Sequence, residues 1–318
     1  MKALAAVFAG ILFIGTAFSA EPYPVKPIRM IVGFAPGGGT DLTARPVAQK
    51  LSELLGQQVI VENRPGAGGN IATEQVARAA PDGYTLLMGT IASLAINPSL
   101  YGNLRFDPET DLAPVIQVVD ATNVLALHPS VPANSVKELV ALAKEKSLSA
   151  GSSGVGATGH LAIELFNLMT GVKLVHVPYK GGGPAMSDLV GGQVNLIFAT
   201  AASAVPHLKS GRIKGIAVTT AKRSALLPDL PTIAEAGLAG FDANNWYGLV
   251  VPAKTPRAII DQLNAEVTKI LAMSDVKTAL FNQGLDAAPG TPEQFGAYIK
   301  SERTKWARVI KESGAKAE

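Results

Sequence analysis

Two glycine-rich loops stand directly before predicted helices and are the segments of this sequence best suited to hold a ligand. The first contains Gly37-Gly38-Gly39 and the second contains Gly154-Val155-Gly156. A helix N-terminus carries unpaired N–H groups and a partial positive charge, and glycine lets a ligand approach the backbone closely. Each loop could therefore bind an anion without an arginine or a lysine. The alternative for each loop taken singly is a plain tight turn.

The serines beside the second loop raise the alternative of an exported serine hydrolase. Ser152 and Ser153 lie in the segment Ala-Gly-Ser-Ser-Gly at 150–154, one residue away from the G-x-S-x-G nucleophile motif. That motif needs an acid and then a histidine later in the chain, which Asp188 and His207 supply formally. No other residue supports this hypothesis, and serines beside an anion-binding loop more simply donate hydrogen bonds.

Cofactor and metal chemistry find little support. The segment 154–159 matches G-x-G-x-x-G, but the acidic residue expected about 20 positions further on is missing. The chain has no cysteine, and its four histidines are not paired at metal-ligand spacing. We therefore expect no catalytic residue, no cofactor and no metal. Lys plus Arg number 28 against 25 for Asp plus Glu, without a basic run, so we expect no nucleic-acid partner.

The N-terminus has the layout of a secretory signal. A charged start, Met1-Lys2, precedes an uncharged apolar run over residues 3–17 and small residues at 17, 19 and 20. The run is shorter than the roughly 20 residues of a membrane span. We predict a signal peptide over residues 1–20, cleaved after Ser19 or Ala20, and retention of the mature chain in the periplasm.

Strands and helices alternate along the chain and must position the two loops. Predicted strands lie at 28–32, 58–62, 85–88, 124–127, 173–177, 194–199 and 213–218, and helices lie at 40–55, 71–80, 135–144 and 157–169. Pro46 lies within the first helical pattern, so we expect that helix to start late or to kink. Strands spaced by helices are typical of mostly parallel sheets with helices outside. Two such runs predict two α/β lobes.

Two long segments could connect the lobes. Residues 115–127 and 244–252 are β-prone, and everything after Pro256 is predicted to be helical. If both segments cross, lobe one is discontinuous, with residues 21–122 and 247–318, and lobe two spans residues 123–246. Because ligands of α/β sheets bind at the carboxyl ends of the strands, both glycine loops would then line one cleft.

The chain resembles the Bug-type solute-binding proteins of tripartite tricarboxylate transporters over essentially its whole length. The resemblance is carried by short ordered segments, which are residues 27–29, 33–41, 44–45, 61–69, 81–87, 154–161, 177–181, 184–185, 188–189, 246–249 and 252. It implies a two-lobed periplasmic binding protein of the Venus-flytrap, type II-like fold. Such a protein is not an enzyme. It acts as a monomer, closes on a di- or tricarboxylate or an aromatic acid, and delivers it to integral membrane transporter subunits.

The resemblance also implies the ligand-binding residues. Backbone amides, hydroxyls and bridging waters would hold carboxylates at Phe34, Ala35, Gly37, Gly38, Asp41, Thr90, Ser152, Ser153, Thr158, His160 and Thr200. The sequence departs from the family pattern at Ala157, where serine is frequent, and at Asn195 and Ala199, where acidic residues are common. The loss of acidic groups disfavours an amino-acid ligand. A binding protein that reports to a sensor kinase instead of a transporter is the other alternative.

Overall fold

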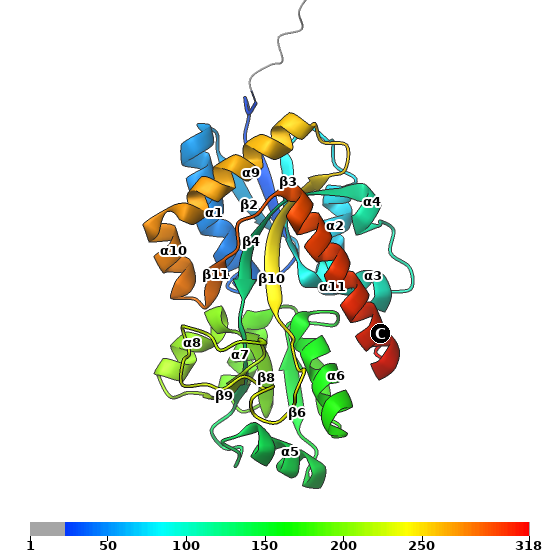
Figure 1. Cartoon of the computed structure of the whole chain (residues 1–318), viewed down its shortest axis with the longest axis vertical. Coiled ribbons are helices and arrows are strands. Elements are labelled where there is room, and N and C mark those ends of the chain that lie inside the picture. Colours follow the sequence, from blue (N-terminus) through cyan, green and yellow to red (C-terminus); the bar gives the residue numbers. More distant parts are fainter. Residues whose placement is uncertain (1–22, 318) are drawn as a thin grey trace, which may run out of the picture.

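The computed structural model describes residues 23–317. This part of the chain forms two β-sheets, one above the other, each flanked by helices and linked by extended strands (Figure 1). The architecture is therefore the expected two-lobed α/β fold. The predicted signal peptide, with its cleavage after Ser19 or Ala20, lies outside the described residues.

The first sheet has six strands. In spatial order these are β11 (Leu285–Ala287), β4 (Leu112–Ala121), β10 (Asn245–Pro252), β3 (Thr85–Thr90), β1 (Ile28–Val32) and β2 (Val59–Asn63). The helical elements of this half are α1 (Gly39–Leu55), the 3₁₀ turn η1 (Ala67–Gly69), α2 (Asn70–Ala77), the π-helical turn η2 (Ala92–Ile96), α3 (Asn97–Leu100), α4 (Pro108–Asp111), α9 (Arg257–Ala272), α10 (Ser274–Phe281) and α11 (Pro292–Ser313). The C-terminal part is helical as predicted, except that it also contributes the short strand β11.

The second sheet has five strands. In spatial order these are β7 (Val175–Pro178), β6 (Ser149–Ser152), β8 (Leu196–Thr200), β5 (Asn123–Leu127) and β9 (Lys214–Val218). Its helices are α5 (Val136–Glu145), α6 (Thr158–Thr170), α7 (Gly182–Val190) and α8 (Ala201–Lys209).

Both sheets are mixed, so the prediction of mostly parallel sheets was wrong. In the first sheet β1 pairs in parallel with β2 and β3, whereas β10 and β11 pair antiparallel with their neighbours. In the second sheet β6 pairs in parallel with β7 and β8, whereas β5 is antiparallel to β8 and β9. The reason is the route of the chain. β5 and β10 each enter their sheet from the side of the other sheet, at the edge where its parallel strands end, and so run in the opposite direction.

The strands that connect the sheets lie side by side. β4 ends at Ala121 and only Thr122 separates it from β5, while β10 pairs with β4 along its whole length, with Asn245 opposite Ala121. The two segments predicted to cross between lobes are therefore the strands that link the sheets. This pair of strands joins the two halves of the molecule.

Helix α1 begins directly at the first glycine loop and passes through Pro46. The prediction of a late start was wrong, because packing outweighs the cost of the proline. Thr43, Ala44, Val47 and Leu51 form one fully buried face against the first sheet, and tertiary packing of such a face supplies most of a helix's stability.

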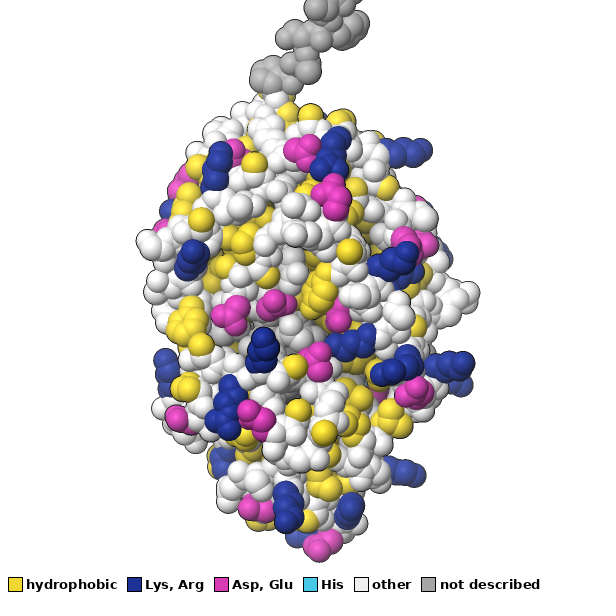
Figure 2. Space-filling model, in the orientation of Figure 1, with side chains coloured by type: hydrophobic (Ala, Val, Ile, Leu, Met, Phe, Trp, Pro, Cys, Tyr) yellow, Lys and Arg dark blue, Asp and Glu magenta, His cyan; other side chains and the backbone are white. Residues whose placement is uncertain are grey.

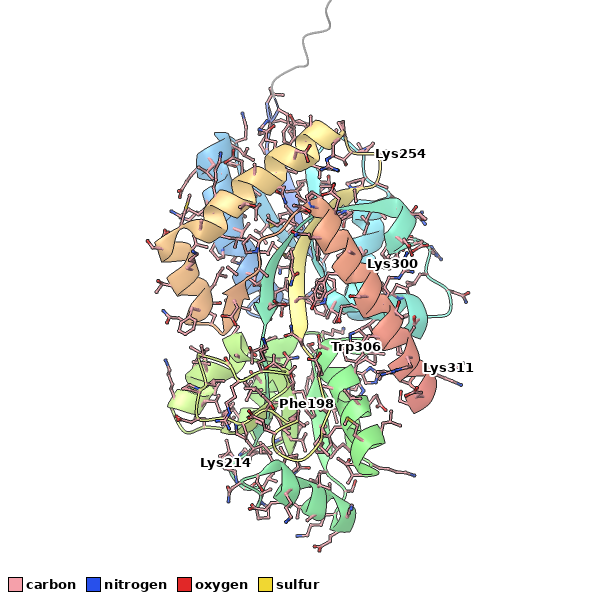
Figure 3. The ribbon with its side chains drawn as sticks, viewed as in Figure 1. Phe198, Lys214, Lys254, Lys300, Trp306 and Lys311 are labelled. Atoms are coloured by element: carbon pink, nitrogen blue, oxygen red, sulfur yellow. The ribbon has the colours of Figure 1, made fainter. Side chains whose placement is uncertain are left out.

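Helix α11 packs against both halves of the molecule, since it contacts η2 of the first half and α6 of the second. Its Trp306 is fully buried, whereas Lys300 and Lys311 of the same helix point outward (Figure 3). The described helices include none long and apolar enough to cross a bilayer. Basic and acidic side chains are mixed over the face of the molecule drawn in Figure 2, without a large area of one sign.

Candidate ligand-binding site

A pocket lies between the two sheets and is lined by residues of both. Its cavity volume is about 50 Å³, whereas one water molecule needs roughly 10–15 Å³. The pocket therefore has room for a small molecule of several heavy atoms. It is lined by Phe34, Gly38, Gly39, Thr40, Thr90, Ala92, Asn123, Ser153, Ala157, Thr158, Gly159, Gly182, Ile197, Phe198, Ala199, Thr200, Ser203, Asn245 and Tyr247.

Strand ends and helix starts converge on this pocket because of the topology. The carboxyl ends of β1, β3, β6 and β8 bring Phe34, Thr90, Ser153 and Thr200 to it. Helices α1, α6, α7 and α8 begin at it. None of their four N-cap residues, which are Gly38, Ala157, Gly181 and Thr200, caps its helix with a side-chain hydrogen bond. Amides of the first helical turns are thus left for a ligand.

The charge of the pocket comes from the backbone. Its lining contains no Lys, Arg, Asp or Glu. Four helix N-termini each contribute a partial positive charge of roughly half an elementary charge. These helix N-termini favour an anion whose oxygens accept hydrogen bonds from the backbone amides. The pocket offers no carboxylate to balance an ammonium group.

Gly39 lets the two halves approach closely at this point. A Cβ at this position would lie 2.6 Å from the Tyr247 hydroxyl and 3.1 Å from Thr200 Oγ1. The Tyr247 hydroxyl accepts a hydrogen bond from Asn245 Nδ2 at 3.0 Å, and burial raises the pKa of Tyr247 far above its ordinary value. The start of α1 is therefore held against the connecting strand β10.

The structure brings six of the eleven predicted ligand residues to the pocket, namely Phe34, Gly38, Thr90, Ser153, Thr158 and Thr200. The other five, Ala35, Gly37, Asp41, Ser152 and His160, do not line it. Sequence reasoning missed Asn123, Asn245 and Tyr247, which start the strands that enter each sheet. The segments 115–127 and 244–252 were recognised as connections, but nothing in them indicated a pocket wall.

Asp41 holds the first loop in place. Its carboxylate accepts hydrogen bonds from the Gly37 backbone N–H at 3.1 Å, from Arg45 Nε at 2.9 Å and from Asn63 Nδ2 at 3.0 Å. Burial alone would raise the pKa of Asp41, but these hydrogen bonds together hold it below its usual value. The carboxylate is therefore ionised, and it ties the first loop to α1 and to the end of β2.

Ser152 and His160 belong to a buried cluster beneath the second loop. Ser152 Oγ lies 2.6 Å from Nε2 of His176, whose ring stacks on that of His160 with centroids 4.2 Å apart. Burial lowers the pKa of His160 to about 4, and burial with the neighbouring His160 lowers that of His176 to about 3. Both rings are neutral near pH 7, and His160 Nδ1 accepts a hydrogen bond from the Gly156 N–H.

This arrangement argues against the hydrolase hypothesis at Ser152. The formal partners are engaged elsewhere, since Asp188 accepts a hydrogen bond from the Tyr179 hydroxyl at 2.7 Å and the histidine at Ser152 is His176 instead of His207. Ser152 is fully buried and does not line the pocket, so a substrate has no access to its hydroxyl. Among the described residues, no group of three His, Asp or Glu side chains is placed to hold a metal ion.

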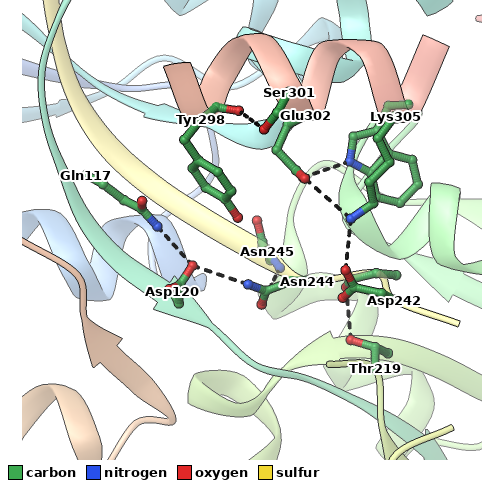
Figure 4. A network of polar contacts seen from close by, with 12 residues as sticks. Gln117, Asp120, Thr219, Asp242, Asn244, Asn245, Tyr298, Ser301, Glu302 and Lys305 are labelled. Atoms are coloured by element: carbon green, nitrogen blue, oxygen red, sulfur yellow. Dashed lines mark hydrogen bonds and ion pairs between the residues drawn. The ribbon is translucent and has the colours of Figure 1, made fainter. Parts of the chain in front are cut away.

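A polar network stands beside the connecting strands and ties them to α11 (Figure 4). Asp120 of β4 accepts hydrogen bonds from Gln117 and Asn244. Lys305 of α11 forms ion pairs with Asp242 at 3.1 Å and with Glu302 at 3.4 Å. Burial raises the pKa of Asp120, with smaller opposing contributions from its two hydrogen bonds. The network links both connecting segments to the C-terminal helix.

Comparisons with known proteins agree with this geometry. Residues 43–315 match the family model of the tripartite tricarboxylate transporter family receptor. An R. palustris protein solved with adipate is 38% identical and superposes with a TM-score of 0.90, over 92% of this chain and 99% of that one. The periplasmic binding protein BugD is 37% identical, with a TM-score of 0.88 over 93% of this chain and 100% of its own.

MatC from Rhodopseudomonas palustris, solved with bound malate, is 33% identical and has a TM-score of 0.86, over 91% of this chain and 100% of that one. These structures share the two-sheet fold and the order of its parts over nearly the whole length. The receptors of this family are solute-binding proteins and not enzymes. The chain belongs to the receptor family of tripartite tricarboxylate transporters.

Proposed function

We propose that this receptor binds a small carboxylate in the pocket between its sheets and delivers it to the integral membrane subunits of its transporter. The observation that carries the proposal is the group of four helix N-termini, without side-chain caps, around a pocket that has no charged side chain. Relatives solved with adipate and malate support this ligand class.

One carboxylate of the ligand accepts hydrogen bonds from backbone N–H groups at the start of α1, around Gly38 and Thr40. The opposite end of the ligand meets the start of α6, where Ser153 and Thr158 add hydroxyl donors. Each hydrogen bond to a charged group contributes roughly 1.5–3 kcal/mol. A few of them, after ordering costs, reach the roughly −8 kcal/mol of micromolar binding.

Closure and release follow from movement of the two halves about the connecting strands. We take lobe one as residues 21–122 and 247–318 and lobe two as residues 123–246. Two contacts beside the pocket join them. The Tyr101 hydroxyl donates to the Val155 carbonyl at 3.3 Å, and a Cβ at Gly181 would lie 3.1 Å from that of Ala35. The ligand adds contacts to both halves only when they are closed, and so shifts the population toward the closed form.

The predicted signal peptide, with cleavage after Ser19 or Ala20, and the periplasmic relatives support export of the chain to the periplasm. We propose that it acts there as a monomer. The test is thermal unfolding of the mature chain after unfolding and refolding have stripped co-purified ligand. The panel pairs small carboxylic acids with their uncharged amides. A ligand at 100 times its dissociation constant stabilises by about 2.7 kcal/mol. A shift with acids but not with amides is expected, and a cooperative transition that no acid moves would refute the proposal.

A further inference from the structure

The side chain of Asn123 stands unpaired in the wall of the pocket. Asn123 is the first residue of β5 and lines the pocket with an exposed fraction of only 1%. Its side-chain nitrogen Nδ2 is fully buried and has no hydrogen-bond partner among the described residues. A buried amide left unsatisfied costs roughly 1–3 kcal/mol, so native structures rarely retain one without a purpose.

Two other polar side chains of the pocket, those of Asn245 and Thr200, are paired within the protein. Asn245 donates to the Tyr247 hydroxyl at 3.0 Å and accepts from the Trp246 N–H at 2.9 Å. Thr200 Oγ1 lies 3.2 Å from Ser203 Oγ. An unpaired amide among satisfied neighbours therefore indicates that its partner arrives with the ligand.

The position of Asn123 shows which part of a ligand it meets. It follows Thr122, the single residue between β4 and β5, and so lies at the crossing between the two sheets. The amides of α1 approach the pocket from one sheet and those of α6 from the other. A ligand that spans both groups therefore passes Asn123 between its two ends.

We propose that Asn123 is a specificity-determining residue that selects acids with an oxygen substituent, a hydroxyl or a keto group, between the ends that the helix N-termini hold. This inference rests on the proposed function and names its substrate class more narrowly. The amide offers an N–H donor and a carbonyl acceptor. It can therefore donate to a keto oxygen or exchange hydrogen bonds with a hydroxyl, whereas an unsubstituted methylene leaves it unpaired.

The experiment measures dissociation constants by calorimetry for matched acids, malate against succinate and 2-hydroxyadipate against adipate. The proteins are the wild type, Asn123→Leu and Asn123→Ala. The alanine variant controls for a steric misfit of the larger leucine side chain. We expect the wild type to prefer the hydroxylated acid of at least one pair by about tenfold, because one neutral hydrogen bond is gained and one buried group is satisfied. Both variants should lose this preference and bind the unsubstituted acid within about threefold of the wild type.

The thermal stability of the unliganded proteins gives a second readout with a matched control. Asn123→Leu replaces an unpaired amide by an apolar group of similar size and should melt at the same or a higher temperature than the wild type. Asn245→Leu removes a paired amide from the same pocket and should melt at a lower one. These opposite signs are expected only if Asn123 lacks a partner within the protein.

Two outcomes would overturn the inference. If the acids bind but the wild type shows no preference, or if the variants keep it, Asn123 contacts only water and the carboxylate function stands without it. If no acid of either kind binds, the proposed function itself fails, and the inference fails with it.

Discussion

An acidic side chain at Gly38 should abolish carboxylate binding while the fold stays intact. Gly38 is the N-cap of α1, its φ of −84° suits any residue, and a Cβ there would meet only Ala35 O at 3.7 Å and Gly182 N at 3.9 Å. Gly38→Asp therefore fits sterically. Aspartate is also a good N-cap residue, so the unliganded variant should be at least as stable as the wild type.

The effect on binding has two parts. The new carboxylate would accept hydrogen bonds from the N–H groups at the start of α1 that the ligand would otherwise use. It would also repel the negative charge of the ligand. Two like charges about 4 Å apart interact by about 4 kcal/mol at an effective dielectric constant of about 20. That corresponds to a loss of affinity of about a thousandfold, since 1.4 kcal/mol is tenfold.

The assay is calorimetric titration of whichever acid stabilises the wild type, with two controls. Gly38→Ala adds neither charge nor cap and should bind within a fewfold of the wild type. Gly38→Asn occupies the amides without a charge and should fall between the alanine and the aspartate variants. Wild-type affinity in Gly38→Asp would refute the assignment of this loop to the ligand, and a loss equal to that of Gly38→Asn would refute the electrostatic part.

Three further predictions concern the contacts around the pocket. Gly39→Ala places a methyl group 2.6 Å from the Tyr247 hydroxyl and should cost roughly 1–3 kcal/mol of stability, measured by denaturant unfolding. A normal midpoint would contradict the close approach. Tyr101→Phe removes the hydrogen bond to Val155 and should weaken ligand binding by about two- to tenfold; unchanged affinity would show that the contact also persists in the open form. The neutral ring of His176 makes stability pH-dependent. Because its folded pKa of about 3 lies below the unfolded value of roughly 6.5, stability is full above pH 6.5 and falls as the pH drops toward 3. In His176→Asn the thermal midpoint should fall less steeply over this range, and an equal slope would contradict the assignment.

Polar groups beneath and beside the pocket fix the two binding loops in place. Asp41 ties the Gly37 amide and Arg45 into the first loop. Ser152 accepts the Gly154 N–H at 3.2 Å in the second loop. The loops are thus fixed before a ligand arrives, and a preorganised site loses less free energy to ordering on binding.

The glycine loops could be recognised from the sequence because their signal is local. Gly38 and Thr158 each lie where a glycine loop meets the start of a helix. The period of apolar residues indicated α1, α2, α5 and α6, whereas α7 and α8 were not predicted. The residues that fix the loops were partly visible as well. Asp41 lies four positions from Arg45 and Gly37, so its contacts arise within one turn of chain. Its role, however, is to hold the loop, and sequence reasoning had placed it at the ligand.

Other features depended on contacts between distant segments, and no local pattern could indicate them. The strand directions follow from the route by which β5 and β10 enter each sheet. His176 meets Ser152 across 24 positions because β6 and β7 are neighbours in the second sheet.

The sequence by itself thus determined the glycine loops, the alternation of strands and helices and the family, because these depend on local chemistry and on ordered short motifs. The tertiary structure alone decided that Asn123, Asn245 and Tyr247 face one pocket. Their meeting depends on how two sheets close against each other, which is a property of the whole packed chain.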